Sequence, residues 1–405
     1  MKTRYGVSPW IHQFPGSRRP DYPKLRGEHV TDVVILGGGL TGCATAQACA
    51  AAGLKTILLE ADRIGQGSAG RSAGLLLPEP GPSFRDVAQA HGLRSARRVF
   101  EHWRRASTDA AALVRKLKIR CDLQPLTTLT IGDDESEKLL RREFDARNDA
   151  GLTPAWLTQK QVRAASGLEA ASAIRHRDAF TLDPYRACLG LAAAAAARKA
   201  RLFERSAAKK IKFTQTGVKV TTAGGIVRAA TVVVTTGSAT AEFATLRRHF
   251  KRRETYLVLT EPLPAAMRLQ VGGGETTFRD TKMPRRRVRW TGDGRILIAG
   301  GDQDQPADRL RDAVRVQRTG QLMYDLLTMY PVIAGLRPEY GWELAYGETA
   351  DGLMYIGPHR NHPHHLFALG GPSDSVTGAF LAAGIVTRSL KRASEKEDQV
   401  FGFTR

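Results

Sequence analysis

Apolar residues follow two different periods along the chain, and each period predicts one kind of element. The run DVVIL at 32–36 is short and apolar, as in a buried strand, and a cluster of glycines follows it. Residues 40–53 have the small-residue pattern of a helix, and KTILLEAD at 55–62 is a second buried strand. A strand, a helix and a strand in this order predict a parallel βαβ unit with a right-handed crossover.

The same patterns extend over the rest of the chain. Residues 1–28 are rich in proline and arginine without a period, so we expect an extended arm that lies on the folded body. Helical spacing predicts helices at about 87–117, 135–150, 184–201, 308–330 and 375–392. Strand-like runs lie at 122–131, 209–214, 217–222, 227–235 and within 256–301. The C-terminal third again has short apolar strand-like runs followed by a helical pattern, as the N-terminal part does. This predicts an α/β dinucleotide-type domain interleaved with an α+β domain that has a mixed sheet.

A glycine motif lies between the first predicted strand and the first predicted helix. It reads GxGxxG at Gly37, Gly39 and Gly42, where glycine allows a tight turn, close approach to a pyrophosphate and close packing of helix on strand. The N–H groups at a helix N-terminus attract phosphate. Glu60 ends the second strand, where a carboxylate can accept hydrogen bonds from both hydroxyls of an adenosine ribose and would repel a 2′-phosphate. The dinucleotide contacts that we expect here are Gly37, Gly39, Leu40, Thr41, Gly42, Glu60 and Ala61. A degenerate fold without cofactor is the alternative.

A second loop, rich in glycine and serine, follows at 65–74. Such residues let the main chain wrap closely around a ligand, whereas the simpler interpretation is a flexible surface loop. The residues expected at the cofactor are Gly67, Ser68, Arg71, Ser72, Ala73 and Gly74, with Arg71 as a phosphate or backbone partner. Together, GGGLTG, Glu60 and RIGQGSAGRSAGLL resemble the glycine/D-amino-acid oxidase (DAO) family of FAD-dependent oxidoreductases, whose second loop has the form GxGASGRNGG.

The resemblance runs over nearly the whole chain. The family's order and spacing are followed by Leu182-Asp183-Pro184, VVVTTG at 232–237, GRILIAGG at 294–301 and TADGLMYIGP at 349–358. The second of these motifs adds Thr236 and Gly237 to the expected cofactor contacts. The arm and the glycine motif look most like the bacterial branch that contains gamma-glutamylputrescine oxidoreductase.

The resemblance implies a Rossmann-like FAD-binding domain interleaved with a mixed-sheet substrate-binding domain. The expected FAD-binding segments are 29–90, 165–250 and 340–405, and the expected substrate-binding segments are 91–164 and 251–339. FAD would lie extended, with its adenine at Glu60 and its ring facing the mixed sheet. The implied activity is that of an FAD-dependent amine or amino-acid oxidase or dehydrogenase, in which hydride passes from the carbon bearing the amine to the flavin. Oxygen or another acceptor would reoxidise the flavin.

The C-terminal loop departs from the family pattern. Where the family commonly reads GxGGNGIT, this chain has GGPSDSVT at 370–377, so a proline removes one N–H donor and serines replace two glycines. Either this loop still presents N–H groups at a helix start or flavin binding is weakened, and a catalytically inactive homologue is the alternative that follows. The residues expected at the flavin are Gly371, Ser373, Asp374, Ser375, Val376 and Thr377. Some family members attach FAD through a cysteine before the T-x-D-G turn, and none lies between Trp342 and Gly352, so we expect noncovalent FAD.

Arginines stand where the family pattern has tyrosines. The stretch 280–290 reads DTKMPRRRVRW, and strand alternation places Arg285, Arg287 and Arg289 on one face. If that face looks into the site, Arg287 and Arg289 are candidates to bind a substrate carboxylate, with Arg289 matching the family arginine. If it looks outward, it is a charged solvent face. The prediction is a small amine or amino-acid substrate that bears a carboxylate.

Charge and composition add few constraints. The chain of 405 residues has 61 Lys and Arg against 40 Asp and Glu, a net charge of +21, and the basic residues are spread along it. An amine carried by a larger anionic partner such as RNA is one alternative, although base-stacking motifs are absent, which argues against nucleic acid. The cluster His359, His362, His364 and His365 is expected in a solvated loop without metal. No apolar run is long enough to span a membrane and the start lacks the pattern of a signal peptide, so we expect a cytoplasmic protein.

Overall fold

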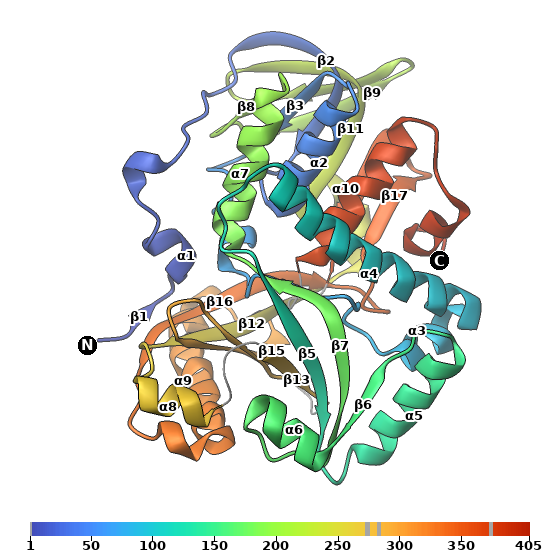
Figure 1. Ribbon diagram of the computed structural model, residues 1–405. Helices are drawn as coiled ribbons and strands as arrows, with labels where there is room; N and C mark the ends of the chain where they lie inside the picture. Colours follow the sequence, from blue (N-terminus) through green and yellow to red (C-terminus); the bar gives the residue numbers. More distant parts are fainter. Residues whose placement is uncertain (1, 272–275, 282–284, 372–375) are drawn as a thin grey trace.

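Two β-sheets, each covered by helices, make up the protein (Figure 1). The computed structural model describes residues 2–271, 276–281, 285–371 and 376–405. No helix of these residues is long and apolar enough to cross a membrane. The sheets confirm the α/β class with a second, mixed sheet that the sequence predicts.

The smaller sheet has a parallel centre. In spatial order its strands are β17 (Tyr355–His359), β18 (His362–Leu369), β11 (Gly225–Gly237), β2 (Gly27–Leu36), β3 (Thr56–Leu59) and β8 (Arg201–Phe203), with β10 (Gly217–Thr221) and β9 (Lys210–Thr214) extending from β11. The neighbours from β18 to β8 run parallel, which confirms the predicted βαβ unit. All four residues of β3 are buried, because a parallel sheet is covered on both faces.

Alanine-rich helices cover this sheet. They are α2 (Leu40–Ala51), α7 (Pro184–Ala197) and α10 (Thr377–Leu390), and the long α4 (Leu93–Lys116) crosses them. α2 contacts both α7 and α10, and α10 also contacts α4 (Figure 1). The small side chains let the helices approach closely, and their buried faces form one apolar core with β2 and β3.

The larger sheet is mixed. Its spatial order is β1 (Arg4–Tyr5), β16 (Pro338–Glu348), β12 (Lys251–Thr260), β15 (Ile296–Asp304), β14 (Arg287–Trp290), β13 (Thr276–Asp280), β5 (Gln124–Gly132), β7 (Ser172–Thr181) and β4 (Leu75–Leu76), with β6 (Ala155–Thr158) beside β7. Two pairs are parallel, β1 with β16 and β13 with β5, and the other pairs are antiparallel. The first residues of the chain therefore form an edge strand of this sheet.

The remaining helices lie mainly around the larger sheet. They are α1 (Pro9–His12), α3 (Phe84–His91), α5 (Glu137–Asp149), α6 (Gln159–Ser166), α8 (Ala265–Gln270) and α9 (Arg311–Met329). Short 3₁₀ helices occur at Gly16–Arg18, Ala69–Arg71, Ala241–His249, Asp308–Leu310, Pro331–Ile333 and Lys396–Phe401. The single helix expected over 87–117 is two helices, because Gly92 has a φ of +81° and breaks the chain between α3 and α4.

Strand pairing refines the division into domains. β7 lies within the segment 165–250 that the sequence assigns to the FAD-binding domain, yet it pairs with β5, β6 and β4 in the larger sheet. We therefore propose that this boundary falls near residue 182, after β7, rather than at 165. The other predicted boundaries stay predictions.

Candidate cofactor and substrate site

A cavity of about 670 Å³ opens where three parallel strands of the smaller sheet end. Gly37 follows β2, Glu60 follows β3, and Thr235 to Gly237 close β11, and all of these residues line it. Ligands of open α/β sheets bind outside the carboxyl ends of the strands. The volume lies within the usual range of about 300 to 1,000 Å³ for ligand sites.

The three glycines of the first motif have three different surroundings. Gly37 has a φ of +110°, and a Cβ there would lie 2.8 Å from the backbone oxygen of Thr235. A Cβ on Gly42 would lie 1.8 Å from the backbone oxygen of Gly37, so helix and strand are in direct contact at this point. A Cβ on Gly39 would meet nothing within 4 Å, and α2 begins after Gly39 without a side-chain cap. Open space in front of an uncapped helix N-terminus suits a pyrophosphate.

Glu60 is held in place by the backbone of both neighbouring loops. Its Oε2 accepts a hydrogen bond from the N–H of Gly38 at 2.5 Å, and its Oε1 accepts one from the N–H of Asp62 at 2.8 Å. The carboxylate also lines the cavity. Because a carboxylate has about four acceptor positions, two remain for the ribose hydroxyls of a bound dinucleotide.

Most of the residues predicted at the cofactor line this one cavity. They are Gly37, Gly39, Leu40, Thr41, Glu60, Ala61, Gly67, Ser68, Ser72, Thr236, Gly237, Gly371 and Val376. The other described members, which are not among the lining residues, are Gly42, Arg71, Ala73, Gly74 and Thr377. Ser373, Asp374 and Ser375 lie outside the described residues. The altered part of the C-terminal loop therefore stays a prediction.

Arg71 has a different partner from the phosphate suggested by the sequence. Its Nη1 is 3.2 Å from Oε1 of Glu343, and Oε2 of the same carboxylate lies 2.5 Å from Nε of Arg315. The backbone oxygen of Arg71 accepts a hydrogen bond from the indole of Trp342 at 2.8 Å. These contacts attach the second glycine loop to the larger sheet, and the expected role of Arg71 as a phosphate or local backbone partner stays a prediction.

The N-terminal arm fixes the same loop from the other side. The hydroxyl of Ser8 donates to the backbone oxygen of Gly70, and the indole of Trp10 donates to that of Ser72 at 3.0 Å. A Cβ on Gly70 would meet the side chain of Ile11 at 2.8 Å. The loop is thus enclosed by protein rather than free on the surface.

The three alternating arginines share one face, and that face looks inward. Arg285 donates to the backbone oxygen of Gly81 at 2.6 Å, and Nη1 of Arg289 donates to those of Ala73 and Gly74 at 2.5 and 2.9 Å. Arg287, between them, lines a hollow together with Leu75 and Leu77. All three side chains thus point toward the segment 73–81, which begins in the second glycine loop. The solvent-face alternative is excluded for Arg287 and Arg289, which are 7% and 4% exposed.

Nη1 of Arg289 donates to backbone, whereas its buried Nε has no hydrogen-bond partner among the described residues, so its role toward a substrate carboxylate stays a prediction. Besides Ala73 and Gly74 it reaches the backbone oxygen of Leu182, and its guanidinium lies 5.2 Å from the ring centroid of Trp10. Burial lowers the pKa of Arg289 to about 10, so the side chain remains charged at neutral pH. Its role in the structure is to hold the chain turn at Gly74.

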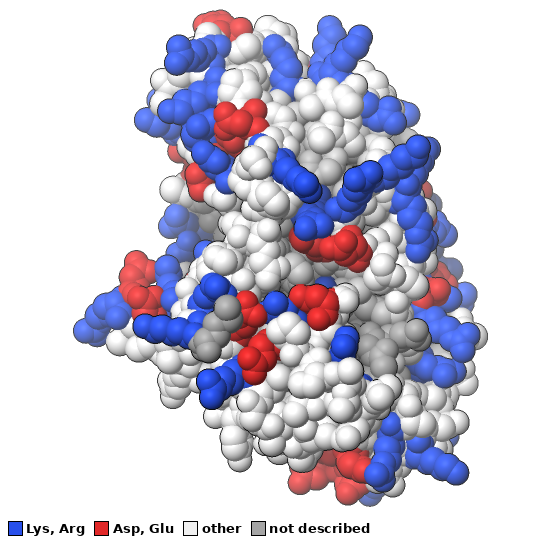
Figure 2. Space-filling model, turned by 60° about the vertical axis from the view of Figure 1, so that its left-hand side comes forward, with Lys and Arg blue, Asp and Glu red and all other residues white. Residues whose placement is uncertain are grey.

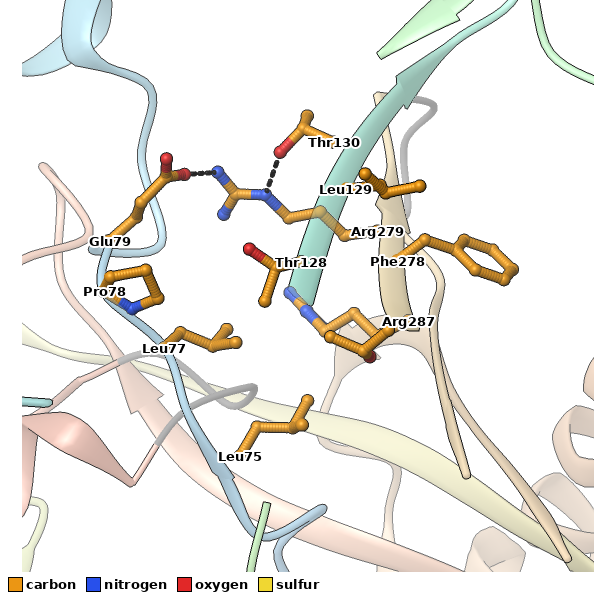
Figure 3. A pocket seen from close by; sticks show the side chains of 11 residues that line it. Leu75, Leu77, Pro78, Glu79, Thr128, Leu129, Thr130, Phe278, Arg279 and Arg287 are labelled. Carbon is orange, nitrogen blue, oxygen red and sulfur yellow. Dashed lines mark hydrogen bonds and ion pairs between the residues drawn. The ribbon is translucent and has the colours of Figure 1, made fainter. Parts of the chain in front are cut away.

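Arg287 instead lines a hollow of about 20 Å³, roughly the space of one water molecule (Figure 3). Leu75 and Leu77 form one wall, and Thr128 faces them from β5. Arg279 stands directly opposite Arg287 on the neighbouring strand. Like charges opposite each other in a sheet are destabilising, so anions must stand nearby.

A buried ionic cluster supplies one such anion. Glu79 Oε2 accepts from Arg279 at 2.7 Å, and Glu79 also pairs with Arg147 and His176 (Figure 3 shows the Arg279 contact). Arg147 in turn lies 2.6 Å from Glu143. Despite burial, these cations keep the pKa of Glu79 well below its usual range. No sequence signal pointed to this cluster, because its members come from four separate segments.

One cationic residue at the cavity was not foreseen from the sequence. Arg252 lines it from the larger sheet, and among the described lining residues it alone is a Lys or Arg. Tyr346 also lines it, and burial raises the pKa of this phenol. No cysteine is among the described residues that line the cavity, and the four cysteines of the chain are buried and free.

The histidine cluster lies in strands rather than in a loop; His359 and His365 are buried, against the expectation, whereas His362 is half-buried and His364 is exposed. His359 ends β17, and His362 and His365 lie in β18. Their rings contact Phe403 and Phe367, and burial is the largest cause that lowers their pKa values. Among the described residues no group of three or more His, Cys, Asp or Glu is arranged to hold a metal ion.

Basic side chains are scattered over the surface. On the face shown in Figure 2, Lys and Arg cover upper and lower parts of the molecule, with smaller groups of Asp and Glu between them. This face shows no single basic stripe. This scatter favours the interpretation that the +21 charge consists of solvated side chains.

Comparisons with known proteins agree with this geometry. The family DAO, described as FAD dependent oxidoreductase, matches residues 32–389. The chain is 24% identical to a probable oxidoreductase OrdL of Haemophilus influenzae, over 94% of this chain and 88% of that protein. It is also 24% identical to gamma-glutamylputrescine oxidoreductase of Escherichia coli, over 91% of this chain and 85% of that protein.

The fold has solved counterparts. The crystal structure of glycine oxidase from Geobacillus kaustophilus superposes with a TM-score of 0.79 at 21% identity, covering 93% of this chain and 99% of that chain. An L-proline dehydrogenase from P. horikoshii gives a TM-score of 0.72 at 18% identity, covering 93% and 97%. The glycine loop, Glu60 and the match over 32–389 lead to one conclusion. The chain belongs to the DAO family of FAD-dependent oxidoreductases.

Proposed function

We propose that the protein oxidises a small amine or amino acid that bears a carboxylate, at a C–N bond, with FAD held noncovalently in the large cavity. The observation that carries the proposal is that the face of β14 with Arg287 and Arg289 points inward. Arg287 lies beside Leu75 and Leu77, in the segment that follows Ser72 of the cofactor cavity. Relatives such as glycine oxidase of Bacillus licheniformis and gamma-glutamylputrescine oxidoreductase support the class of reaction.

The described residues fit FAD. The uncapped N-terminus of α2 would hold the pyrophosphate, and Glu60 would hold the adenosine ribose. The first turn of α10 borders the other part of the cavity, where Val376, Gly378 and Ala379 lie. When bound, FAD supplies the hydride acceptor for the carbon that bears the amine.

Residues of the larger sheet would orient the substrate. A charged Arg287, 7% exposed, attracts a carboxylate strongly because little water screens it. Leu75 and Leu77 provide an apolar wall that excludes water, and Arg289 fixes the backbone next to them. We give Arg289 this positioning role and keep Arg287 as the carboxylate-binding residue. Hydride transfer needs a neutral amine and a positioned C–H bond, and it requires no strong nucleophile in the protein.

The test compares amino acids with their decarboxylated amines. Reduction of the flavin by each compound is followed anaerobically as loss of visible absorbance, in the wild type, Arg287→Met and Arg177→Met. Arg177 is an exposed arginine of β7 and serves as the matched control. The amino acids should reduce the flavin faster, and Arg287→Met should cost them about 2 to 5 kcal/mol, at least roughly 30-fold. Faster reduction by the plain amines, or an Arg287→Met variant equal to the control, would refute the assignment.

The cofactor itself has a simpler test. The purified protein should be yellow, and acid should release the flavin into the supernatant as FAD. Flavin that stays with the precipitated protein would contradict noncovalent binding. A colourless protein that does not take up FAD would instead support the inactive homologue.

A further inference from the structure

A second cavity, of about 230 Å³, lies between α2, α4 and α10. The helices α2 and α10 border both cavities: Leu40 of α2 and Ala379 of α10 line the cofactor cavity, whereas Ala44 of α2 and Phe380 of α10 line the second one. One water occupies about 30 Å³ of the liquid, so the second cavity holds several waters or one small organic molecule.

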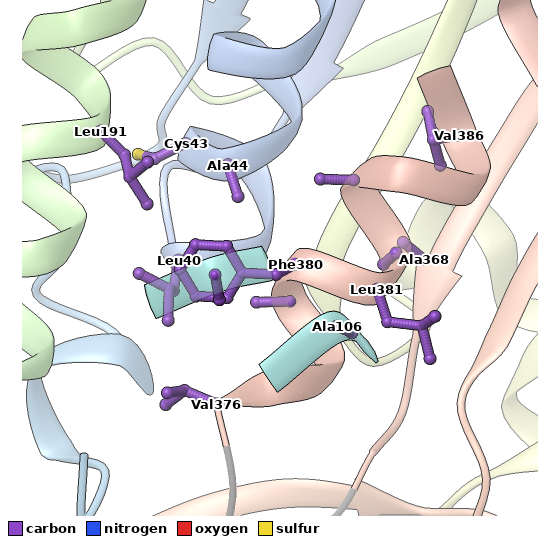
Figure 4. Close-up of a cluster of buried hydrophobic side chains, with 14 of the residues drawn as sticks. Leu40, Cys43, Ala44, Ala106, Leu191, Ala368, Val376, Phe380, Leu381 and Val386 are labelled. Carbon is purple, nitrogen blue, oxygen red and sulfur yellow. The ribbon is translucent and has the colours of Figure 1, made fainter. Parts of the chain in front are cut away.

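The walls of this cavity are apolar because small residues face each other where the three helices cross. Ala44 and Ala48 of α2 are one turn apart, and Ala106 and Ala110 of α4 repeat the pattern. Figure 4 shows Ala44, Ala106, Phe380 and Leu381 converging from the three helices. Such a surface suits a small aliphatic group.

Gln47 is the polar residue in the floor. It is 4% exposed and lines the cavity, yet its amide makes no hydrogen bond to any described residue. The amide atoms are accessible from the cavity, so they can bond water or a ligand there. A polar ligand group, or waters that it displaces, would satisfy this amide.

Two charges of opposite sign stand at the rim without an ion pair among the described residues. They are Arg105 and Asp109, one turn apart on α4. The other ionised residues of the rim are paired, since Arg388 contacts Asp398 at 2.5 Å and Glu395 at 3.8 Å. The unpaired rim charges are therefore available to a ligand that itself carries both signs.

We propose that this cavity is a second ligand site, which binds a small zwitterionic amino acid with an aliphatic side chain. The carboxylate faces Arg105 and the Gln47 amide, the ammonium faces Asp109, and the side chain packs on the alanines of α2 and α4. The site is separate from the cofactor cavity and does not depend on the proposed reaction.

Calorimetric titration of the holoenzyme with α-methylleucine tests the proposal. This probe is zwitterionic and aliphatic but has no hydrogen on its α-carbon, so it cannot lose a hydride to flavin. Two analogues each lack one charge: 4-methylpentanoate has no ammonium and 3-methylbutylamine has no carboxylate. Both should bind at least about threefold more weakly than α-methylleucine.

Variants locate the binding. Gln47→Leu keeps the size of the side chain and should weaken α-methylleucine about tenfold, and Ala48→Leu should abolish binding by filling the cavity. Arg97→Gln, an exposed position of α4, is the matched control and should bind as the wild type does. Thermal unfolding of each variant checks that it is folded.

Three results would overturn the inference. They are no heat of binding with α-methylleucine in the wild type, equal binding in folded Gln47→Leu and Ala48→Leu, and 4-methylpentanoate or 3-methylbutylamine binding as tightly as the zwitterion. Loss of binding in Arg287→Met with full binding in Gln47→Leu would assign the probe to the substrate site instead. None of these results bears on whether the flavin is reduced by substrate, so the two proposals fail separately.

Discussion

Replacing Gly39 and Gly42 by alanine, one at a time, separates cofactor contact from protein packing. The two positions are in the same motif, three residues apart. A Cβ at Gly39 meets nothing within 4 Å, whereas a Cβ at Gly42 lies 1.8 Å from the backbone oxygen of Gly37 and 2.8 Å from the hydroxyl of Thr235. The first change therefore adds a methyl group on the side of the cavity, and the second forces two backbones apart.

The magnitudes follow from these distances. Gly39 has a φ of −75° and a ψ of −175°, which alanine adopts without strain, so the apoprotein of Gly39→Ala should unfold within about 0.5 kcal/mol of the wild type. Its methyl group stands where a pyrophosphate would approach the backbone. Loss of one charge-assisted hydrogen bond costs about 1.5 to 3 kcal/mol, so FAD should bind roughly 10- to 150-fold more weakly. Gly42→Ala should destabilise the apoprotein by about 3 kcal/mol or more, because backbone cannot yield as a side chain does.

The assay uses two readouts on the same preparations. Urea unfolding of the apoproteins gives the free energy of unfolding, and quenching of flavin fluorescence gives the dissociation constant for FAD. The predicted pattern is normal stability with weak binding for Gly39→Ala, and low stability for Gly42→Ala. If Gly39→Ala bound FAD with wild-type affinity, the pyrophosphate would not lie at this helix start, and the placement of the cofactor would be refuted.

Three further predictions concern buried charge and the ribose site. Arg147→Met leaves Glu79 and Glu143 buried without their shared partner and should cost about 3 to 5 kcal/mol in urea unfolding; a loss equal to that of an exposed arginine of α5 would contradict the cluster. Burial raises the pKa of Asp183 to about 6, so the folded protein holds this proton longer than the unfolded chain and stability falls as pH rises from about 4 to 6. Asp183→Asn keeps the helix cap and should therefore be more stable than the wild type at pH 7, by up to about 3 kcal/mol, with no difference near pH 4; equal pH profiles would show that the acid is not perturbed. Glu60→Ala should weaken FAD by roughly 1.5 to 3 kcal/mol per lost hydrogen bond, and unchanged affinity in fluorescence titration would place the ribose elsewhere.

Local chemistry along the chain was enough to predict the cofactor half of the site. The strand, glycine motif and helix at 32–53 depend on turn geometry and short-range packing, which sequence expresses directly, and the structure has them at β2 and α2. Alternation also grouped Arg285, Arg287 and Arg289 correctly on one face. Periodicity cannot tell which way such a face points, since both faces of a strand in a covered mixed sheet are buried.

Long-range partners were beyond the sequence. Arg71 and Glu343 are 272 residues apart, and their pairing, which links the second glycine loop to the larger sheet, left no local signal in the sequence. The sequence also could not assign β7 to a sheet. An amphipathic strand can pair in either sheet, and only its long-range pairing with β5 places it in the larger one. Arg289 matches the family arginine, yet its Nη1 donates hydrogen bonds to the backbone oxygens of Ala73 and Gly74, which are 216 and 215 residues away in the sequence.

The edge strand β1 can join its sheet only after its partner β16 has been synthesised. Its neighbour Thr3 donates to the backbone oxygen of Pro338, 335 residues later, so the two sides of this contact are made far apart in time. At about 5 to 20 residues per second, roughly 17 to 70 s pass between the two. During that interval the arm cannot pair with β16. The contacts of Ser8 and Trp10 with the second glycine loop then lack the support of this strand pairing. The second glycine loop is thus covered only after β16 has been made, and a chain that stopped before β16 would carry an intact glycine motif without its cover.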